Sequence, residues 1–135
     1  MQISHFSSGA LVGRLSPNPA VAFAAGVVSH FVIDKIPHYW PASTKAKWIF
    51  TIIDYAVAIV MIGVLLVGSK ADRTNMLWGF AGSASVDILL VGVPFLHKTR
   101  FGQWHTNRQP HRTEIAFLAT DLLMAAVCFT LVRVI

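Results

Sequence analysis

"AKWIFTIIDYAVAIVMIGVLLVG", residues 46–68, is an apolar run with two charged side chains, Lys47 near its start and Asp54 in its first half. A helix of about 20 apolar residues is long enough to cross the hydrocarbon core of a bilayer. An ionised Asp near the middle of a bilayer costs about 2.5–3.5 kcal/mol on insertion scales. The run therefore predicts a membrane-spanning helix whose carboxylate faces other protein groups.

The whole chain has a membrane-like composition. Of its 135 residues, 55% are apolar and 13% are charged, and the mean hydropathy is +0.61; soluble domains carry about 25% charged residues. We expect one all-α integral membrane domain over residues 1–135, with four spans and a short N-terminal half-helix. The spans are expected at residues 18–36, 46–68, 76–96 and 114–135, and the half-helix at residues 4–13.

The distribution of Lys and Arg predicts an orientation. Loops 37–45 and 97–113, with the adjoining helix ends, hold seven of the eleven Lys and Arg residues. The positive-inside rule places these loops in the cytoplasm and both termini outside. We therefore expect a bacterial inner (cytoplasmic) membrane protein. The net charge of +5 is interpreted as membrane topology and lipid contact, so no nucleic-acid partner is expected.

Polar side chains of five predicted segments fall at one depth. At about 1.5 Å per residue, four of them lie roughly 9–13 Å from the cytoplasmic helix ends. The half-helix adds a fifth if it runs antiparallel to the first span. The five residues are His5, His30, Asp54, Asp87 and Asp121. We expect these groups to face one another inside the bundle, because buried carboxylates need partners.

The stretch "GVVSHFVIDKIPHYW", residues 26–40, places His30, Asp34 and His38 at four-residue spacing, which is one face of a helix. A layer of His and Asp has three explanations: a metal ion, a proton or ion relay, or hydrogen bonds that hold helices together. The metal is favoured, because helices are more often joined by Ser, Thr, Asn or Gln. The predicted ligands of a Zn, Mn or Fe ion are His5, His30, Asp34 and Asp87.

Further residues are predicted to support this site. Asp54 is expected to act as a base or to orient a ligating histidine. His38 is expected to serve as a ligand or as an acid on the substrate side, and a solvated loop histidine is the alternative. The third loop, "HKTRFGQWHTNRQPHRTE", is expected either to bind a phosphate head group or only to touch anionic lipid. Its candidate head-group residues are Arg100, Arg108, Arg112 and His105.

The box at Ser29, His30, Asp34, Pro37 and His38 resembles a family of small polytopic membrane proteins regarded as metal-dependent hydrolases. Members carry S-H-x-x-x-D-x-x-P-H and often open with a Thr-His pair, for which this chain has Ser-His at residues 4–5. The "FGQWH" stretch, residues 101–105, is similar to the aromatic and His-bearing loop of the family. Members often have an acid soon after the Pro-His pair, where this chain has Tyr-Trp-Pro. The resemblance implies metal-dependent hydrolysis.

We expect a membrane-embedded hydrolase that acts on a lipid or lipid-linked substrate, which could be phosphorylated, with its site toward the cytoplasmic side. A bound ion would activate water and polarise the scissile group. The alternative is a non-catalytic subunit that packs against membrane-protein partners and uses its polar residues for assembly or cofactor ligation. A transporter is a third possibility, disfavoured because the chain has neither inverted repeats nor paired broken helices.

Overall fold

The computed structural model describes residues 2–67, 70–93, 95–108 and 110–135, without the side chains of residues 70–72, 91, 92, 97 and 108. Over these residues the expected all-α class is confirmed. The α-helices are α1 (Gln2–Arg14), α2 (Pro19–Ile33), α3 (Thr44–Leu65), α4 (Lys70–Gly92), α5 (Arg100–Arg108) and α6 (Ala116–Val134). A 3-10 turn, η1 (Leu96–Lys98), precedes α5, and β1 (His38–Tyr39) pairs in parallel with β2 (His111–Arg112).

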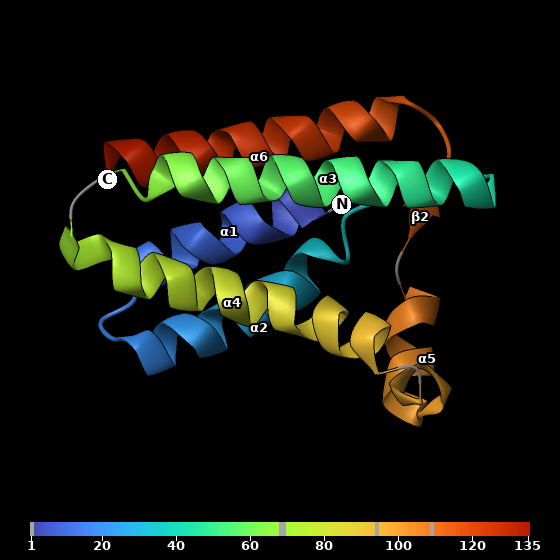
Figure 1. Ribbon diagram of the computed structural model, residues 1–135, viewed down its shortest axis with the longest axis horizontal. Coiled ribbons are helices and arrows are strands. Elements are labelled where there is room, and N and C mark those ends of the chain that lie inside the picture. The colour runs from blue at the N-terminus through green and yellow to red at the C-terminus, as the bar shows by residue number, and fades with distance from the viewer. Residues whose placement is uncertain (1, 68–69, 94, 109) are drawn as a thin grey trace.

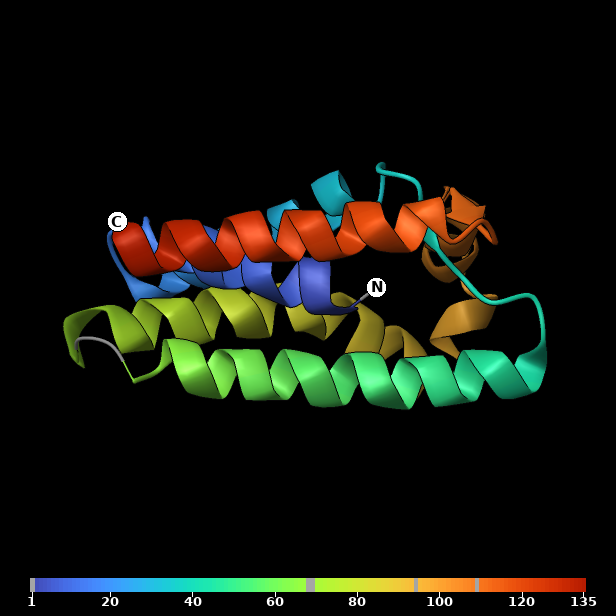
Figure 2. The ribbon, with the colours of Figure 1, turned by 90° about the horizontal axis from the view of Figure 1, so that it is seen from above.

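The long helices run side by side in one bundle, and α5 is set across their direction at one end (Figures 1 and 2). α1 lies inside the bundle and contacts α2, α3, α4 and α6. The predicted half-helix is therefore the central helix of the fold. Most of its residues are buried, so most side chains near its start face other helices.

Local sequence signals set the ends of two helices. The side chain of Asn18 accepts a hydrogen bond from the Val21 N–H at 3.0 Å, and Pro19 occupies the first position of α2, where its missing N–H costs nothing. α2 ends with Asp34 as its C-cap, three residues before Pro37, which disfavours helical backbone at the residue preceding it. Ser43 caps α3 in the same way as Asn18 caps α2.

Glycine lets three helices approach closely at one crossing. A Cβ added to Gly26 of α2 would lie 2.0 Å from the carbonyl oxygen of Gly79 in α4, and one added to Gly9 of α1 would lie 2.7 Å from the same oxygen. Small residues at helix crossings allow such backbone contact. The crossing fixes α1 and α2 on α4 one to two turns from the polar site.

Two of the four expected spans, 46–68 and 114–135, correspond to α3 and α6, which are long and apolar enough to cross a membrane. The expected span 18–36 is shorter in the structure: α2 has 15 residues, or roughly 22 Å at 1.5 Å per residue. The expected span 76–96 begins earlier, because α4 starts at Lys70 and includes the charged residues of its first turn. Among the described helices, only two thus qualify as spans by length and composition.

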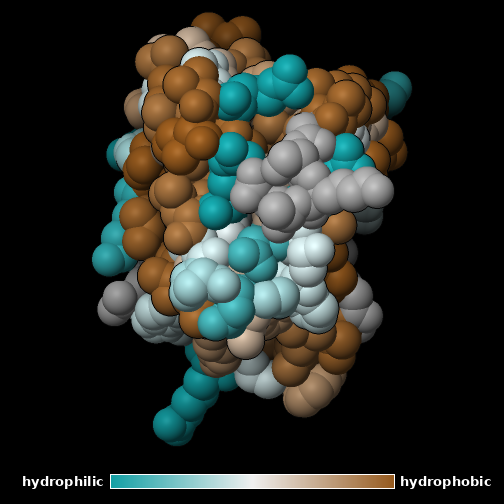
Figure 3. Space-filling view, turned by 90° about the vertical axis from the view of Figure 1, so that its left-hand side faces the viewer, coloured by the Kyte–Doolittle hydropathy of each residue, from teal (hydrophilic) through white to brown (hydrophobic). Residues whose placement is uncertain are grey.

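The outer surface of these two helices is apolar. Of the most hydrophobic window of each, only 22% (α3) and 17% (α6) is buried in the protein. Ile52, Ile59 and Val60 of α3 are each more than 60% exposed. At the end of the bundle that Figure 3 faces, hydrophilic residues gather between hydrophobic flanks. The core helix of a soluble protein would be mostly buried, whereas these two helices are long and apolar enough to cross a membrane and leave most of their apolar surface uncovered.

Candidate metal centre

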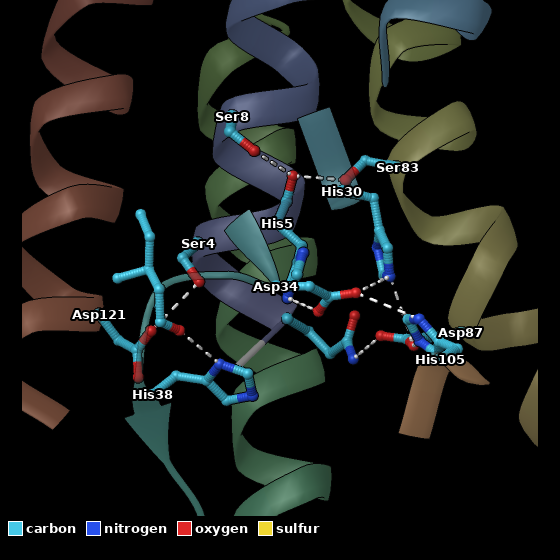
Figure 4. A network of polar contacts seen from close by, with 12 residues as sticks. Ser4, His5, Ser8, His30, Asp34, His38, Ser83, Asp87, His105 and Asp121 are labelled. Atoms are coloured by element: carbon cyan, nitrogen blue, oxygen red, sulfur yellow. Dashed lines mark hydrogen bonds and ion pairs between the residues drawn. The ribbon is translucent and has the colours of Figure 1, made fainter. Parts of the chain in front are cut away.

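Three histidine and two aspartate side chains, contributed by four helices, meet in the interior (Figure 4). They come from the start of α1, the last turn and C-cap of α2, the second half of α4 and the middle of α5. These residues are His5, His30, Asp34, Asp87 and His105. We refer to them as the His/Asp cluster. Four of the five were predicted as ligands, and the fifth, His105, was assigned to a head-group site.

Asp34 lies at the centre of the His/Asp cluster. Its Oδ1 is 3.4 Å from Nε2 of His5, and its Oδ2 is 3.2 Å from Nε2 of His30 and 3.3 Å from Nδ1 of His105. His30 and Asp34 meet because the four-residue spacing continues to the C-cap of α2. One carboxylate therefore faces imidazoles from three different helices.

Asp87 approaches the same histidines from α4. Its Oδ1 is 3.7 Å from Nε2 of His30 and 3.4 Å from Nε2 of His105. Its Oδ2 accepts a hydrogen bond from the Nε2 amide of Gln2 at 2.6 Å. His105 thus has one ring nitrogen toward each carboxylate, and Gln2 holds the orientation of Asp87.

The geometry of the His/Asp cluster suits a small divalent cation. Two overlapping sets, His5–His30–Asp34 and His30–Asp87–His105, each have ligand atoms within 4.8 Å of one another. Nitrogen and oxygen donors at about 2.0–2.1 Å around a tetrahedral ion are about 3.3 Å apart, so only small shifts are needed. Two carboxylates would also be offset by the charge of the ion. The residues present therefore fit a metal.

Burial strengthens this interpretation. His30 is fully buried and His5 is 2% exposed. Among the described residues, Nδ1 of His5 and Oε1 of Gln2 have no hydrogen-bond partner. An unpaired buried polar atom costs about 1–3 kcal/mol. Since both atoms lie on residues at the His/Asp cluster, a bound ion with its water would lower this cost.

The backbone of α1 is tied to its neighbours around His5. The carbonyl oxygen of His5 accepts hydrogen bonds from Oγ of Ser8 at 2.9 Å and from Oγ of Ser83 at 2.7 Å. The second of these bonds joins α1 to α4. It holds His5 on the side of the bundle where Asp87 lies.

Asp54 and Asp121 lie beside the start of α1, outside the His/Asp cluster. Asp54 accepts hydrogen bonds from the backbone N–H groups of Gln2 and Ile3, the unpaired donors at the start of α1. Asp121 accepts from Oγ of Ser4 at 3.4 Å and from the N–H of Tyr39 at 3.1 Å. The two aspartates therefore fix the start of α1, and the described contacts do not include a bond from Asp54 to a histidine.

Replacing Asp54 with alanine tests this positioning role. Two N–H groups of α1 lose their acceptor, so we expect a loss of about 2 kcal/mol in stability. Because His5 follows one turn later, metal affinity should fall about tenfold while the number of bound ions stays the same. Thermal unfolding and metal titration of the purified protein measure both effects, and Asp54→Asn, which keeps one acceptor, should fall between. Complete loss of the ion with unchanged stability would instead identify Asp54 as a ligand.

His38 borders the His/Asp cluster without joining either ligand set. Its ring centroid is 6.3 Å from that of His5, and its Nδ1 donates to the carbonyl oxygen of Ile36 at 3.1 Å, which leaves Nε2 as an acceptor. Burial lowers the pKa of His38 to about 4. Burial also lowers the pKa of His111, whose ring is 4.9 Å from that of His38. Both rings are therefore neutral at pH 7.

A cavity of about 630 Å³ lies beside the His/Asp cluster and is lined in part by His5, Asp87 and His105. Of the predicted head-group residues, His105 lines it. Arg100 and Arg112 are exposed and do not line it, and the side chain of Arg108 lies outside the described part of the chain. Lys47 of α3 supplies a cationic group to the cavity wall instead.

The sequence reasoning missed Gln2 and Lys47 as residues of the site. Gln2 carries no charge and Lys47 was counted only toward topology, so neither gave a signal of its own. His105 had a usable signal, because Phe101 and His105 are four residues apart and stack in the structure. Comparison of the chain with models of protein families, with curated proteins and with solved structures gives no match, so the assignment of the site depends on the geometry of the His/Asp cluster.

Proposed function

We propose that the protein is a membrane-embedded, metal-dependent hydrolase that acts on a lipid or lipid-linked substrate, like the family that its Ser29–His38 box resembles. The observation that carries the proposal is the convergence of three imidazoles and two carboxylates beside a cavity that His5, Asp87 and His105 line. A structural ion pair needs fewer groups. A cavity beside the ligands gives a substrate a place to bind.

The same proposal includes four membrane-crossing segments. α3 and α6 expose apolar side chains to their surroundings. α2 and α4 pack on α1 and on each other along the same bundle, so a bilayer that surrounds α3 and α6 also surrounds them. The site lies toward the end that carries α5 and the loops rich in Lys and Arg, which is the proposed cytoplasmic side.

Within the proposal, His5, His30, Asp34, Asp87 and His105 hold the ion. A bound divalent ion would lower the pKa of its water toward 7 and polarise the scissile group. Gln2 keeps Asp87 in place, and the neutral ring of His38 offers Nε2 as a proton acceptor at the cavity wall. Both carboxylate oxygens of Asp54 already accept backbone N–H groups, which favours Asp54 as a positioning residue over a general base.

Metal analysis and hydrolysis assays on the full chain, purified in a neutral detergent, test the proposal. We expect about one tightly held divalent ion per chain. We also expect the protein to hydrolyse fluorescent phospholipids in mixed micelles, with the released products identified by mass spectrometry. A chelator should abolish hydrolysis, and Zn²⁺, Mn²⁺ or Fe²⁺ should restore it. A chain that holds no ion, hydrolyses none of the lipids and purifies only with partner chains would contradict the proposal and support a non-catalytic subunit.

A further inference from the structure

One wall of the cavity is a side of α3. Thr44, Lys47, Trp48, Thr51 and Tyr55 line the cavity at intervals of three or four residues, the spacing of one helix face. Across the cavity lie Leu90 of α4 and Thr106 of α5. The cavity thus continues from the metal ligands to a wall that is partly apolar and partly hydroxylated.

Lining residues of the cavity on α3 and α5, Trp48 and Thr106, are exposed. In the described part of the chain, α3 packs mainly on α1 and α6, and its first turns extend past the start of α1 (Figures 1 and 2). Trp48 lines the cavity and is 65% exposed, so it stands at the rim. Leu90 is 3% exposed and lies inside. An opening beside α3, whose outer surface is apolar, would admit a molecule from the bilayer.

The rim of the cavity carries one lysine, Lys47. Among the described residues of the lining, Lys47 is the one lysine or arginine, and Thr44 and Thr51 lie one turn to either side of it on the same face. An ammonium group flanked by hydroxyls suits a phosphate. Lys47 and Trp48 are also residue types that mark the head-group level of a bilayer. The rim therefore matches the phosphate of a lipid in the surrounding leaflet.

Depth separates this phosphate site from the His/Asp cluster. Lys47 and Asp54 are seven residues apart on α3, or roughly 10 Å along the helix. Asp54 is bonded to Gln2, and Gln2 to Asp87, so the level of Asp54 is the level of the cluster. In a phospholipid, the acyl ester linkages lie deeper in the bilayer than the phosphate. A phosphate at Lys47 thus brings an ester linkage, rather than the phosphate, toward the cluster.

We propose that the cavity takes up one anionic phospholipid through the opening beside α3, holds its phosphate at Lys47 and presents an acyl ester to the His/Asp cluster. The ester step rests on the proposed hydrolase function. In that step the oxygen of a water molecule bonds to the acyl carbon, the ester C–O bond breaks and a proton passes to the leaving alkoxide. The products are a fatty acid and a lysophospholipid.

Photolabelling of metal-free protein tests binding without any need for turnover. The probe is phosphatidylglycerol with a diazirine in one acyl chain, in nanodiscs of phosphatidylcholine, and labelled residues are located by mass spectrometry. We expect labels on Thr51, Tyr55 and Leu90, and a decrease of about fivefold in Lys47→Met, the effect of losing one cation near an anionic lipid. Lys45→Met, exposed and outside the lining, is the matched control and should label as the wild type does.

A second pair of variants fills the cavity. Leu90→Trp should abolish labelling of the cavity wall, whereas Leu89→Trp, at a position 54% exposed, should leave it unchanged; helix content and elution volume check that each variant folds. Labels confined to outward-facing residues, or equal cavity labelling by the zwitterionic phosphatidylcholine probe, would overturn the binding site.

The products formed by metal-loaded protein separate this inference from the proposed function. Fatty acid and lysophosphatidylglycerol are expected. Diacylglycerol would overturn the ester assignment while supporting a metal-dependent hydrolase. Labelling of the cavity wall with no product from any lipid would support the binding site while contradicting the hydrolase and, with it, the ester step.

Discussion

The variant His30→Ala is expected to lose its metal ion and its hydrolytic activity together. His30 is fully buried and belongs to both candidate ligand sets, so its removal breaks either one. Its Nε2 lies 3.2 Å from Asp34 and 3.7 Å from Asp87, and without the imidazole the two carboxylates lose a shared partner. Loss of an outer-sphere partner alone lowers metal affinity about 10–100-fold. Removal of His30, a candidate ligand, should therefore lower metal affinity by more than about 100-fold.

Calorimetric metal titration and thermal unfolding measure this effect. At a metal concentration about 100 times the dissociation constant, the wild type should gain about 2.7 kcal/mol of stability, and His30→Ala should gain almost none. His111→Ala is the matched control, because it removes another cavity-lining imidazole outside both ligand sets. His30→Gln, which fills more of the vacated volume, checks that the loss is not caused by misfolding. A full complement of tightly held ions in His30→Ala and His30→Gln would rule out the His/Asp cluster as the metal site.

Two sequence features could predict part of the site: the short-range spacing of residues on one helix, and the depth of polar residues within the expected membrane spans. His30 and Asp34 share a face because they are four residues apart, and the structure places them 3.2 Å apart. His5 and Asp87 could be predicted because a polar side chain in an apolar helix must find a partner. His105 could not be placed in the same way, because α5 has nine residues and was read as part of a loop. A short amphipathic helix becomes stable mainly through packing, here of Phe101 and His105 on Phe31.

The span boundaries show a related limit. A hydropathy pattern finds apolar residues, but helix ends depend on caps and turns, so the expected 18–36 became Pro19–Ile33. α1 contains three serines and two glycines and was predicted as a half-helix, because it is too short to span a bilayer. Its burial depends on the close approach of Gly9 and Gly13 to α4; their G-x-x-x-G spacing predicts close packing on a neighbour but does not identify which helix that neighbour is. Asp54 was predicted as a base or as a partner of a ligating histidine; its contacts with the backbone N–H groups of Gln2 and Ile3 could not be predicted before α1 was placed.

Because α2 and α4 cross so closely, a single added methyl group at the crossing is expected to cause a large loss of stability. In Gly26→Ala, the added Cβ would lie 2.0 Å from the carbonyl oxygen of Gly79 and 2.9 Å from the backbone nitrogen of Ser83. Backbone atoms of two packed helices cannot move aside as a side chain can, so the helices must separate. We expect a loss of about 3 kcal/mol in stability, at the upper end of the usual cost of overpacking.

The same substitution should weaken metal binding, although Gly26 belongs to neither candidate ligand set. His30 follows Gly26 by one turn of α2, and Asp87 follows Ser83 by one turn of α4, so separation at the crossing increases the distance from His30 to Asp87. Gly63→Ala is the control, because a Cβ there meets nothing within 4 Å and alanine should stabilise α3 by up to about 1 kcal/mol. Thermal unfolding and metal titration in detergent compare the two variants. If Gly26→Ala unfolds at the wild-type temperature and keeps its metal affinity, α2 and α4 do not cross as closely as the structure shows, and the glycine contact does not position the His/Asp cluster.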